Sequence, residues 1–128
     1  MISNIKIKTI NKEISSIVID EPKTYNSLSF QNLLDLLKAL KKLDIDKKVK
    51  VIIIEGSGKG FSAGHNLKEV RGLKQKAKYQ KLFNLCSKVM LQIVEGRKPV
   101  IAKVHGAAFA AGCQLVASCD LAYSTKAV

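Results

Sequence analysis

Four consecutive β-branched residues near the middle of the chain, Val51-Ile52-Ile53-Ile54, constrain its fold more than any other feature. Such a run is typical of a strand that is buried on both faces, as in a parallel sheet flanked by helices. Residues 30–40 repeat apolar side chains with helical spacing after Ser29, a residue type that caps helices. Residues 79–93 carry a second helical stripe, which Gly96 ends. A buried strand between two amphipathic helices predicts an α/β fold.

Further β-rich runs extend this pattern toward both ends of the chain. Residues 5–10 and 14–19 are rich in isoleucine and are separated by a short polar turn, which predicts a hairpin. Residues 100–104 and 121–124 predict two more strands, with a helix of small residues at 110–117 between them. The order, a strand pair followed by three helix–strand pairs, fits one contiguous core in a chain of 128 residues.

The last predicted strand lies beside the end of the sequence, so we expect residues 1–128 to form an incomplete domain. We expect apolar side chains on its last elements to lack partners, and the isolated chain to aggregate or to need a complementary half. The side chains in this group are those of Val100, Ile101, Val104, Leu115, Val116 and Leu121.

The charge of the chain is strongly positive, with 22 Lys and Arg against 10 Asp and Glu and a net charge of +12. Only two of the basic residues are arginines, which favours a solvated lysine surface over a set of phosphate-binding forks. A basic nucleic-acid-binding module is the weaker alternative, because aromatic residues make up only 5% of the chain and the lysines are spread over several elements. We therefore expect no nucleic-acid partner.

The cysteines and the hydropathy pattern indicate a compartment. Cys86, Cys113 and Cys119 form no CxxC pair, which argues against a disulfide framework and against a structural zinc site. No apolar run approaches the ~18 residues of a membrane-spanning helix, and the first twenty residues resemble neither a secretory signal nor a transit peptide. The expected location is the cytoplasm, with no membrane partner and no metal.

Three segments rich in small residues are candidates for binding chemistry. Residues 56–60 resemble a phosphate cradle but lack the spacing of a P-loop or a dinucleotide fingerprint, so we interpret them as a flexible strand exit. Residues 61–67 and 107–114 let the backbone approach a ligand and present free N–H groups to it. Two such donors aimed at one point form an oxyanion hole, although small residues also suit close packing of helix on strand.

Three stretches carry a family resemblance. GKGFSAGHNLKEV (58–70), KPVIAKVHGAAFAAGCQLVASCDLA (98–122) and EPKTYNSLS (21–29) resemble, in order and spacing, the enoyl-CoA hydratase/isomerase or crotonase superfamily. Details of the first two stretches are similar to the branch called enoyl-CoA hydratase domain-containing protein 3. The resemblance covers the N-terminal half of the family's domain and implies a ββα-spiral fold. It also implies acyl-CoA or enoyl-CoA thioesters of fatty acid metabolism as substrates, trimers among the relatives, and the mitochondrial matrix as the alternative location in a eukaryote.

Carried over by position, the resemblance implies a site. The backbone N–H groups of His65 and Ala111 would polarise the thioester carbonyl of the substrate. Ala63 and Gly64 would line the path of the adenine and pantetheine, and His65 would also border it. Lys23 and Tyr25 lie where the family contacts the CoA nucleotide, and no separate cofactor is implied.

One position departs from the family pattern. Hydratases of this family have a catalytic glutamate where this chain has Gln114, and the second family glutamate lies in a region beyond this sequence. An amide does not exchange protons at neutral pH, so hydration by two carboxylates is not expected. A catalytically inactive truncated or split relative therefore remains an alternative to an active enzyme.

Five side chains in or near these motifs could have either a chemical or a structural role. The His65 imidazole is either a general base or a bystander beside its own N–H. His105 is favoured as a turn residue, and Cys113 as a packed residue rather than a nucleophile. Glu69 is expected at the start of a helix, and Asp120 at a cap or turn.

Overall fold

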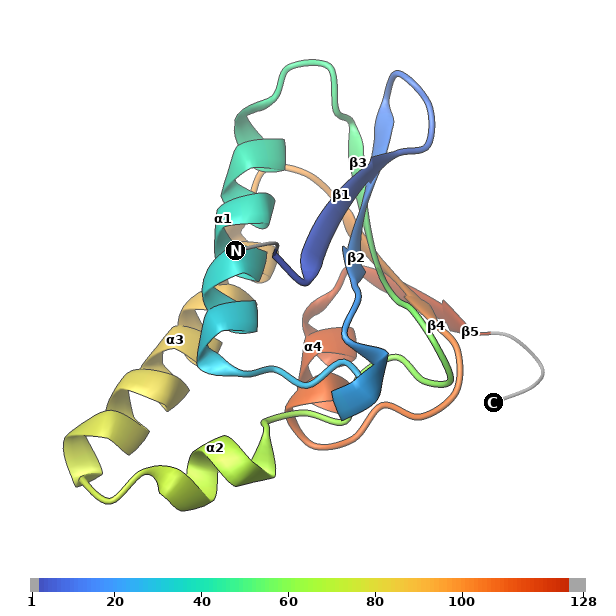
Figure 1. The fold of residues 1–128 in the computed structure, drawn as a ribbon. Helices are drawn as coiled ribbons and strands as arrows, with labels where there is room; N and C mark the ends of the chain where they lie inside the picture. The colour runs from blue at the N-terminus through green and yellow to red at the C-terminus, as the bar shows by residue number, and fades with distance from the viewer. Residues whose placement is uncertain (1–2, 125–128) are drawn as a thin grey trace.

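A computed structural model describes residues 3–124, which form a five-stranded sheet with helices on one face (Figure 1). The strands are β1 (Ile5–Thr9), β2 (Ile14–Ile19), β3 (Val51–Gly56), β4 (Val100–Val104) and β5 (Leu121–Ser124). The helices are the 3₁₀ turn η1 (Pro22–Thr24), α1 (Phe30–Ile45), α2 (Leu67–Gly72), α3 (Lys76–Glu95) and α4 (Ala111–Ser118). The strands lie in sequence order, with β1 antiparallel to β2 and every later pair parallel. The predicted order of strands and helices is confirmed, with α2 as an addition.

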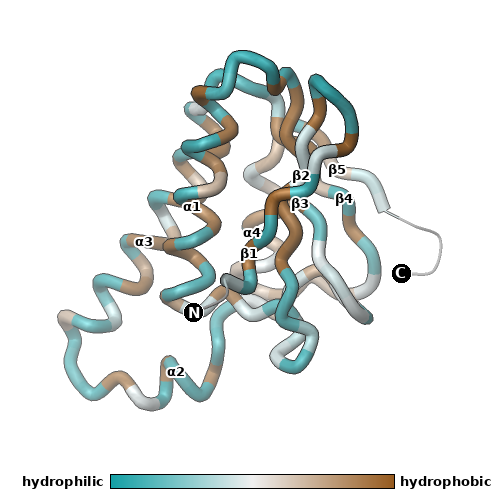
Figure 2. Tube along the Cα trace, turned by 45° about the horizontal axis from the view of Figure 1, so that its top comes forward, coloured by the Kyte–Doolittle hydropathy of each residue, from teal (hydrophilic) through white to brown (hydrophobic). Residues whose placement is uncertain are grey.

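Local signals account for the two long helices. The Ser29 hydroxyl accepts a hydrogen bond from the Asn32 N–H at 3.1 Å, which caps α1 as predicted. The Gly96 N–H donates to the Gln92 carbonyl at 2.9 Å and ends α3. In Figure 2 both helices alternate between apolar and polar positions, and they pack against each other through their apolar stripes. The buried residues of α1 are Asn32, Leu33, Leu36, Leu37, Ala39, Leu40 and Leu43.

The sheet is covered on one face only. The side chains of Ile17, Ile54 and Ala102, which pair across β2, β3 and β4, are fully buried under the helices. Their neighbours Ile53 and Ile101, which point to the other face, are only half-buried. The expectation that the central run is buried on both faces is therefore wrong, because in this structure helices pack against one face only.

Six apolar side chains on the last elements are predicted to lack partners, and for three of them this is wrong. Val100 and Val104 on β4 and Leu115 on α4 are buried, because they lie between the sheet and the helix layer. Ile101 and Val116 are half-buried, and only Leu121 on β5 is largely exposed, at 67%. Within residues 3–124, β5 pairs with β4 alone.

The short helix α2 lies at a distance from the sheet, between the exit of β3 and the start of α3 (Figure 1). The Asn66 side chain accepts a hydrogen bond from the Glu69 N–H at 3.2 Å and so caps the N-terminus of α2. At six residues, α2 is too short to show a helical period in the sequence.

Candidate functional site

A cavity of about 770 Å³ lies between α3, the start of α4 and the segment that leaves β3. It brings together His65, Ala111 and Gln114, three residues that the sequence singled out. The rest of its lining is mostly apolar and consists of Phe83, Cys86, Ser87, Met90, Leu91 and Ala110.

Gly64 allows the two segments that border this cavity to touch. Its φ of +88° lies in the left-handed region, which favours glycine. A Cβ on Gly64 would lie 2.9 Å from the Phe109 carbonyl oxygen and 3.2 Å from the Ala111 nitrogen. The segments are also joined by a hydrogen bond, because the Phe109 N–H donates to the Ser62 carbonyl at 3.0 Å. The backbone of residues 62–65 is thus in direct contact with the first turn of α4.

Among the described residues, three backbone donors remain unpaired at this contact, and those of His65 and Ala111 are the two that the sequence singled out. Within residues 3–124, neither the His65 N–H nor the Ala111 N–H has a hydrogen-bond acceptor. Some neighbouring donors have acceptors: the Gly64 N–H bonds the Ser62 hydroxyl at 3.2 Å, and the Gly112 N–H bonds the Phe109 carbonyl at 2.8 Å. The N–H of Ala110, like that of Ala111, has none within residues 3–124. Ala111 is also the first residue of α4, where the helix dipole is positive. Two free donors bordering one cavity are what an oxyanion hole requires.

Ala110, the residue that precedes α4, is strained. Its φ of +48° and ψ of −118° place a residue with a Cβ in a region that such residues rarely occupy. This conformation sets the direction in which the chain enters α4. The strain therefore lies beside the unpaired Ala111 N–H.

The His65 imidazole is held on two sides. Its Nδ1 lies 3.4 Å from the Leu28 carbonyl oxygen, and its ring packs edge-to-face on Phe83 with centroids 5.2 Å apart. The Leu28 N–H in turn donates to the Gly64 carbonyl at 2.7 Å, which joins the segment before α1 to the same loop.

Gln114 and the cysteines differ in exposure. Gln114 is exposed and lines the cavity. Cys113 is exposed as well, so its interpretation as a packed residue is wrong, because the phase of α4 turns it outward. Cys86 lines the cavity but is buried, and burial raises the pKa of its thiol.

A second cavity, of about 450 Å³, lies beside η1. Lys23 and Tyr25, the predicted nucleotide contacts, line it together with Lys59. A smaller cavity of about 270 Å³ shares Tyr25 and Lys59 with it and adds Ala63. Gly64 is buried and lines neither of these two cavities. Sequence reasoning missed Lys59 as a site residue, although a lysine inside a glycine-rich turn was a signal for it.

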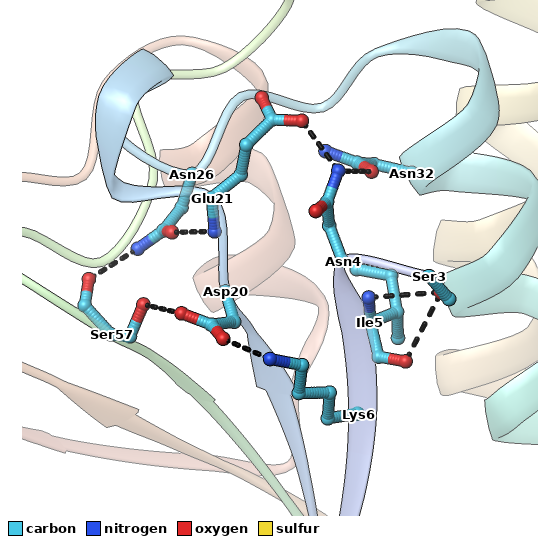
Figure 3. A network of polar contacts seen from close by, with 9 residues as sticks. All are labelled: Ser3, Asn4, Ile5, Lys6, Asp20, Glu21, Asn26, Asn32 and Ser57. Carbon is cyan, nitrogen blue, oxygen red and sulfur yellow. Dashed lines mark hydrogen bonds and ion pairs between the residues drawn. The ribbon is translucent and has the colours of Figure 1, made fainter. Parts of the chain in front are cut away.

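The turn at residues 56–60 is anchored by a polar network (Figure 3). The Asn26 amide nitrogen donates to the Ser57 carbonyl at 2.7 Å and to the Gly60 carbonyl at 3.0 Å. The Ser57 hydroxyl donates to Asp20 at 2.7 Å, and Asp20 also pairs with Lys6. Hydrogen bonds from Lys6 and Ser57 lower the pKa of the Asp20 carboxyl. The interpretation of this turn as a flexible strand exit is wrong, because side chains from β1 and the η1 region hold it.

Three further candidates have structural partners. The His105 Nε2 lies 2.6 Å from the Gly58 carbonyl oxygen and braces the same turn. Glu69 accepts a hydrogen bond from the Phe30 N–H at 2.9 Å, so its carboxylate caps α1 rather than only its own helix. Asp120 accepts from the Val100 N–H at 2.8 Å, in agreement with its prediction as a turn carboxylate.

In the part of the chain that the structure describes, no three His, Cys, Asp or Glu side chains gather in a way that would hold a metal ion. No helix among residues 3–124 combines the length and apolar character needed to cross a membrane.

Comparison with known proteins adds independent findings. The model of the family described as enoyl-CoA hydratase/isomerase matches residues 9–127. The chain is 42% identical over 112 residues to enoyl-CoA hydratase domain-containing protein 3, mitochondrial, of Xenopus laevis, and 44% identical to its Homo sapiens counterpart. Each alignment covers 88% of this chain, but only 38% and 37% of the respective relatives.

Solved structures match the fold closely. The crystal structure of an enoyl-CoA hydratase from Mycobacterium smegmatis superposes with a TM-score of 0.92 at 41% identity, over 96% of this chain and 48% of that one. The human enoyl-CoA hydratase domain-containing protein 3 superposes with a TM-score of 0.89 at 40% identity, over 94% and 47% of the two chains. The chain spans about half the length of these solved structures.

Proposed function

The chain belongs to the enoyl-CoA hydratase/isomerase family and has the crotonase fold over the part it spans, and from that premise we propose that its main cavity binds the thioester end of an acyl-CoA or enoyl-CoA. The observation that carries this proposal is the pair of unpaired N–H groups of His65 and Ala111 beside one cavity. A thioester carbonyl oxygen that gains negative charge is stabilised by two such preorganised donors. The likeness to enoyl-CoA hydratases supports the same substrate class and a place in fatty acid metabolism.

The remainder of the CoA would occupy the two smaller cavities. Lys23 and Lys59 supply positive charge for the phosphates of the nucleotide, and Tyr25, which is 61% exposed, supplies an aromatic surface between the two cavities. Ala63 continues the lining toward His65, its near neighbour in the chain. A small side chain at this point leaves room for the pantetheine.

The reaction assigned to the site is limited by its lining. No carboxylate lines the main cavity among the described residues, and the position of the family's glutamate is taken by Gln114. An amide neither donates nor accepts a transferable proton at neutral pH. The proposal is therefore thioester binding and carbonyl polarisation, and hydration by paired carboxylates is not part of it.

Binding of butyryl-CoA, measured by isothermal titration calorimetry, tests the proposal. Ala111→Pro removes one donor and should weaken binding at least about tenfold, or about 1.4 kcal/mol. His65→Ala keeps the backbone donor and should change affinity by less than about threefold, well under 1 kcal/mol. Cys113→Ala, an exposed change in the same helix, is the matched control.

Two results would contradict the proposal. One is the absence of butyryl-CoA binding by the unaltered chain. The other is an equally large loss of affinity from Ala111→Pro and from His65→Ala, which would mean that the side chain and not the backbone of residue 65 holds the carbonyl. Circular dichroism of each variant checks that the fold is intact.

A further inference from the structure

Among the described residues that line the main cavity, one side chain, the His65 imidazole, is of a type that commonly acts as a general base. The polar lining of the cavity consists of His65, Cys86, Ser87 and Gln114. Burial raises the pKa of the Cys86 thiol and keeps it neutral, while a serine hydroxyl and a glutamine amide do not titrate in this range. The imidazole of His65 is therefore the one candidate base in the lining of this cavity.

The contacts of this imidazole define which nitrogen carries the proton. The Leu28 carbonyl can only accept a hydrogen bond, so the Nδ1 atom that lies 3.4 Å from it is the donor. Nε2 is then the nitrogen with the free lone pair. Among the described residues, Nε2 has no hydrogen-bond partner, and no buried side-chain nitrogen or oxygen lacks one. Nε2 is consequently open to solvent rather than enclosed by protein.

The packing of the ring keeps this arrangement in place. Phe83 meets the imidazole edge-to-face with an interplanar angle of 89°, and both rings line the same cavity. A base whose second nitrogen is oriented by a fixed acceptor follows the usual design of catalytic histidines. The same residue also supplies one of the two backbone donors proposed to hold the carbonyl, so base and oxyanion donor lie at one point of the chain.

We propose that Nε2 of His65 removes and returns a proton at the α-carbon of a bound saturated acyl thioester. This inference rests on the proposed function, because the thioester must first be held by the His65 and Ala111 N–H groups. In the forward step the Cα–H bond breaks, the proton moves to Nε2, and the electron pair moves into the enolate, whose oxygen is held by the two donors. The reverse step returns a proton, after exchange with solvent, and no co-reactant is consumed.

A single base is enough for this exchange. The same nitrogen takes the proton and gives it back, whereas hydration also requires a water molecule to be placed and activated at the β-carbon. The absence of carboxylates from the cavity lining therefore does not prevent exchange.

The test is incorporation of deuterium from D₂O into the α position of butyryl-CoA, followed by mass spectrometry. The unaltered chain should exchange the α protons faster than buffer alone. His65→Asn should lower the rate at least about 100-fold, the usual contribution of a positioned base. The asparagine amide nitrogen can still donate to the Leu28 carbonyl, so the loop keeps its contact. His65→Gln is a second variant without a base, and Cys113→Ala is the control that should exchange at the unaltered rate.

The outcomes separate this inference from the proposed function. The inference is supported if His65→Asn still binds butyryl-CoA but no longer exchanges its α protons. Exchange that persists in both His65 variants overturns it, as does binding without any exchange by the unaltered chain, and either result leaves the proposed function standing. Absence of binding by the unaltered chain overturns both.

Discussion

Two turns of small residues, at 56–60 and 107–112, are alike in composition and opposite in structure. In the first turn, Asn26 occupies the carbonyls of Ser57 and Gly60, and the Ser57 N–H donates to the Ile19 carbonyl at 2.9 Å. In the second turn, the Ala111 N–H has no acceptor within residues 3–124. The first turn is therefore held by a buried side chain, and the second leaves a donor beside the main cavity.

The difference shows that glycine and alanine content does not identify a binding loop. An unpaired backbone donor does not identify it alone either, because the Gly58, Lys59 and Gly60 N–H groups of the first turn also have no acceptor within residues 3–124. The Ala111 donor of the second turn differs because it lies at the start of α4 and borders the main cavity. The strain at Ala110 is found in the second turn only, next to that donor. Strain of this kind is characteristic of functional sites.

The largest effect on stability is expected from removing the Asn26 side chain, which anchors the first turn. Asn26→Ala should lower the free energy of unfolding by about 3 kcal/mol or more, since each buried polar group left without a partner costs about 1–3 kcal/mol. Asn26 is 1% exposed, and its φ of +54° adds a cost for alanine. Urea unfolding followed by circular dichroism measures the change. Asn84→Ala, on the exposed face of α3, should stay within about 0.5 kcal/mol of the unaltered chain. An equally small effect of Asn26→Ala would remove the contrast between the two turns.

The next effect concerns the strained residue of the second turn. Ala110→Gly should raise the free energy of unfolding by about 1 kcal/mol, because glycine adopts the observed φ of +48° without a Cβ clash. Ala117→Gly, at an exposed position inside α4, should instead lower it by up to about 1 kcal/mol. Thermal melts of the two variants give the opposite signs directly. A loss of stability from both changes would mean that residue 110 is not strained.

Thiol labelling probes the helix that follows the second turn. Cys113 is exposed, whereas Cys86 is buried and Cys119 is half-buried. Burial and the nearby Asp120 carboxylate raise the pKa of the Cys119 thiol to about 12, so at about pH 8 roughly one thiol in 10⁴ is the reactive thiolate. Iodoacetamide followed by peptide mass spectrometry should modify Cys113 well before the other two. Faster labelling of Cys119 would contradict the packing of α4.

The smallest expected effect is on the pH dependence of stability, through the contacts of Asp20 with Lys6 on β1 and with Ser57 in the first turn. Lys6 and Ser57 lower the pKa of Asp20 in the folded chain, so this carboxylate stabilises the fold above its unfolded pKa of about 3.9. That contribution is lost as the pH falls through the folded pKa. Asp20→Asn should therefore be less stable than the unaltered chain near neutral pH and equally stable in strong acid. A stability difference independent of pH would contradict the assignment.

Much of the fold could be predicted because its signals are local. The hairpin, the Ser29 cap of α1 and the Gly96 end of α3 follow from residue types and spacing within a few positions. The short helix α2 has no readable period, and the burial of Val100 and Leu115 depends on which face of the sheet the helices cover. That choice is made by tertiary packing.

The site was predictable in part for a similar reason. The resemblance pointed to His65, Ala111 and Gln114, and the structure places all three at one cavity. The anchoring role of Asn26 could not be predicted, because it arises from a left-handed backbone and from partners more than thirty positions away in the sequence. The side-chain contacts of His65 likewise involve Leu28 and Phe83, which come from distant parts of the chain.

The most direct test of the central claim is the infrared stretch of a ¹³C-labelled thioester carbonyl in bound butyryl-CoA. If the His65 and Ala111 N–H groups both donate to the carbonyl oxygen, the band should move to lower frequency on binding, because donors at the oxygen polarise the double bond. The shift should be retained in His65→Ala and largely lost in Ala111→Pro at concentrations where both variants are saturated. The claim would be contradicted if the carbonyl band of butyryl-CoA bound to the unaltered chain had the same frequency as that of free butyryl-CoA in water.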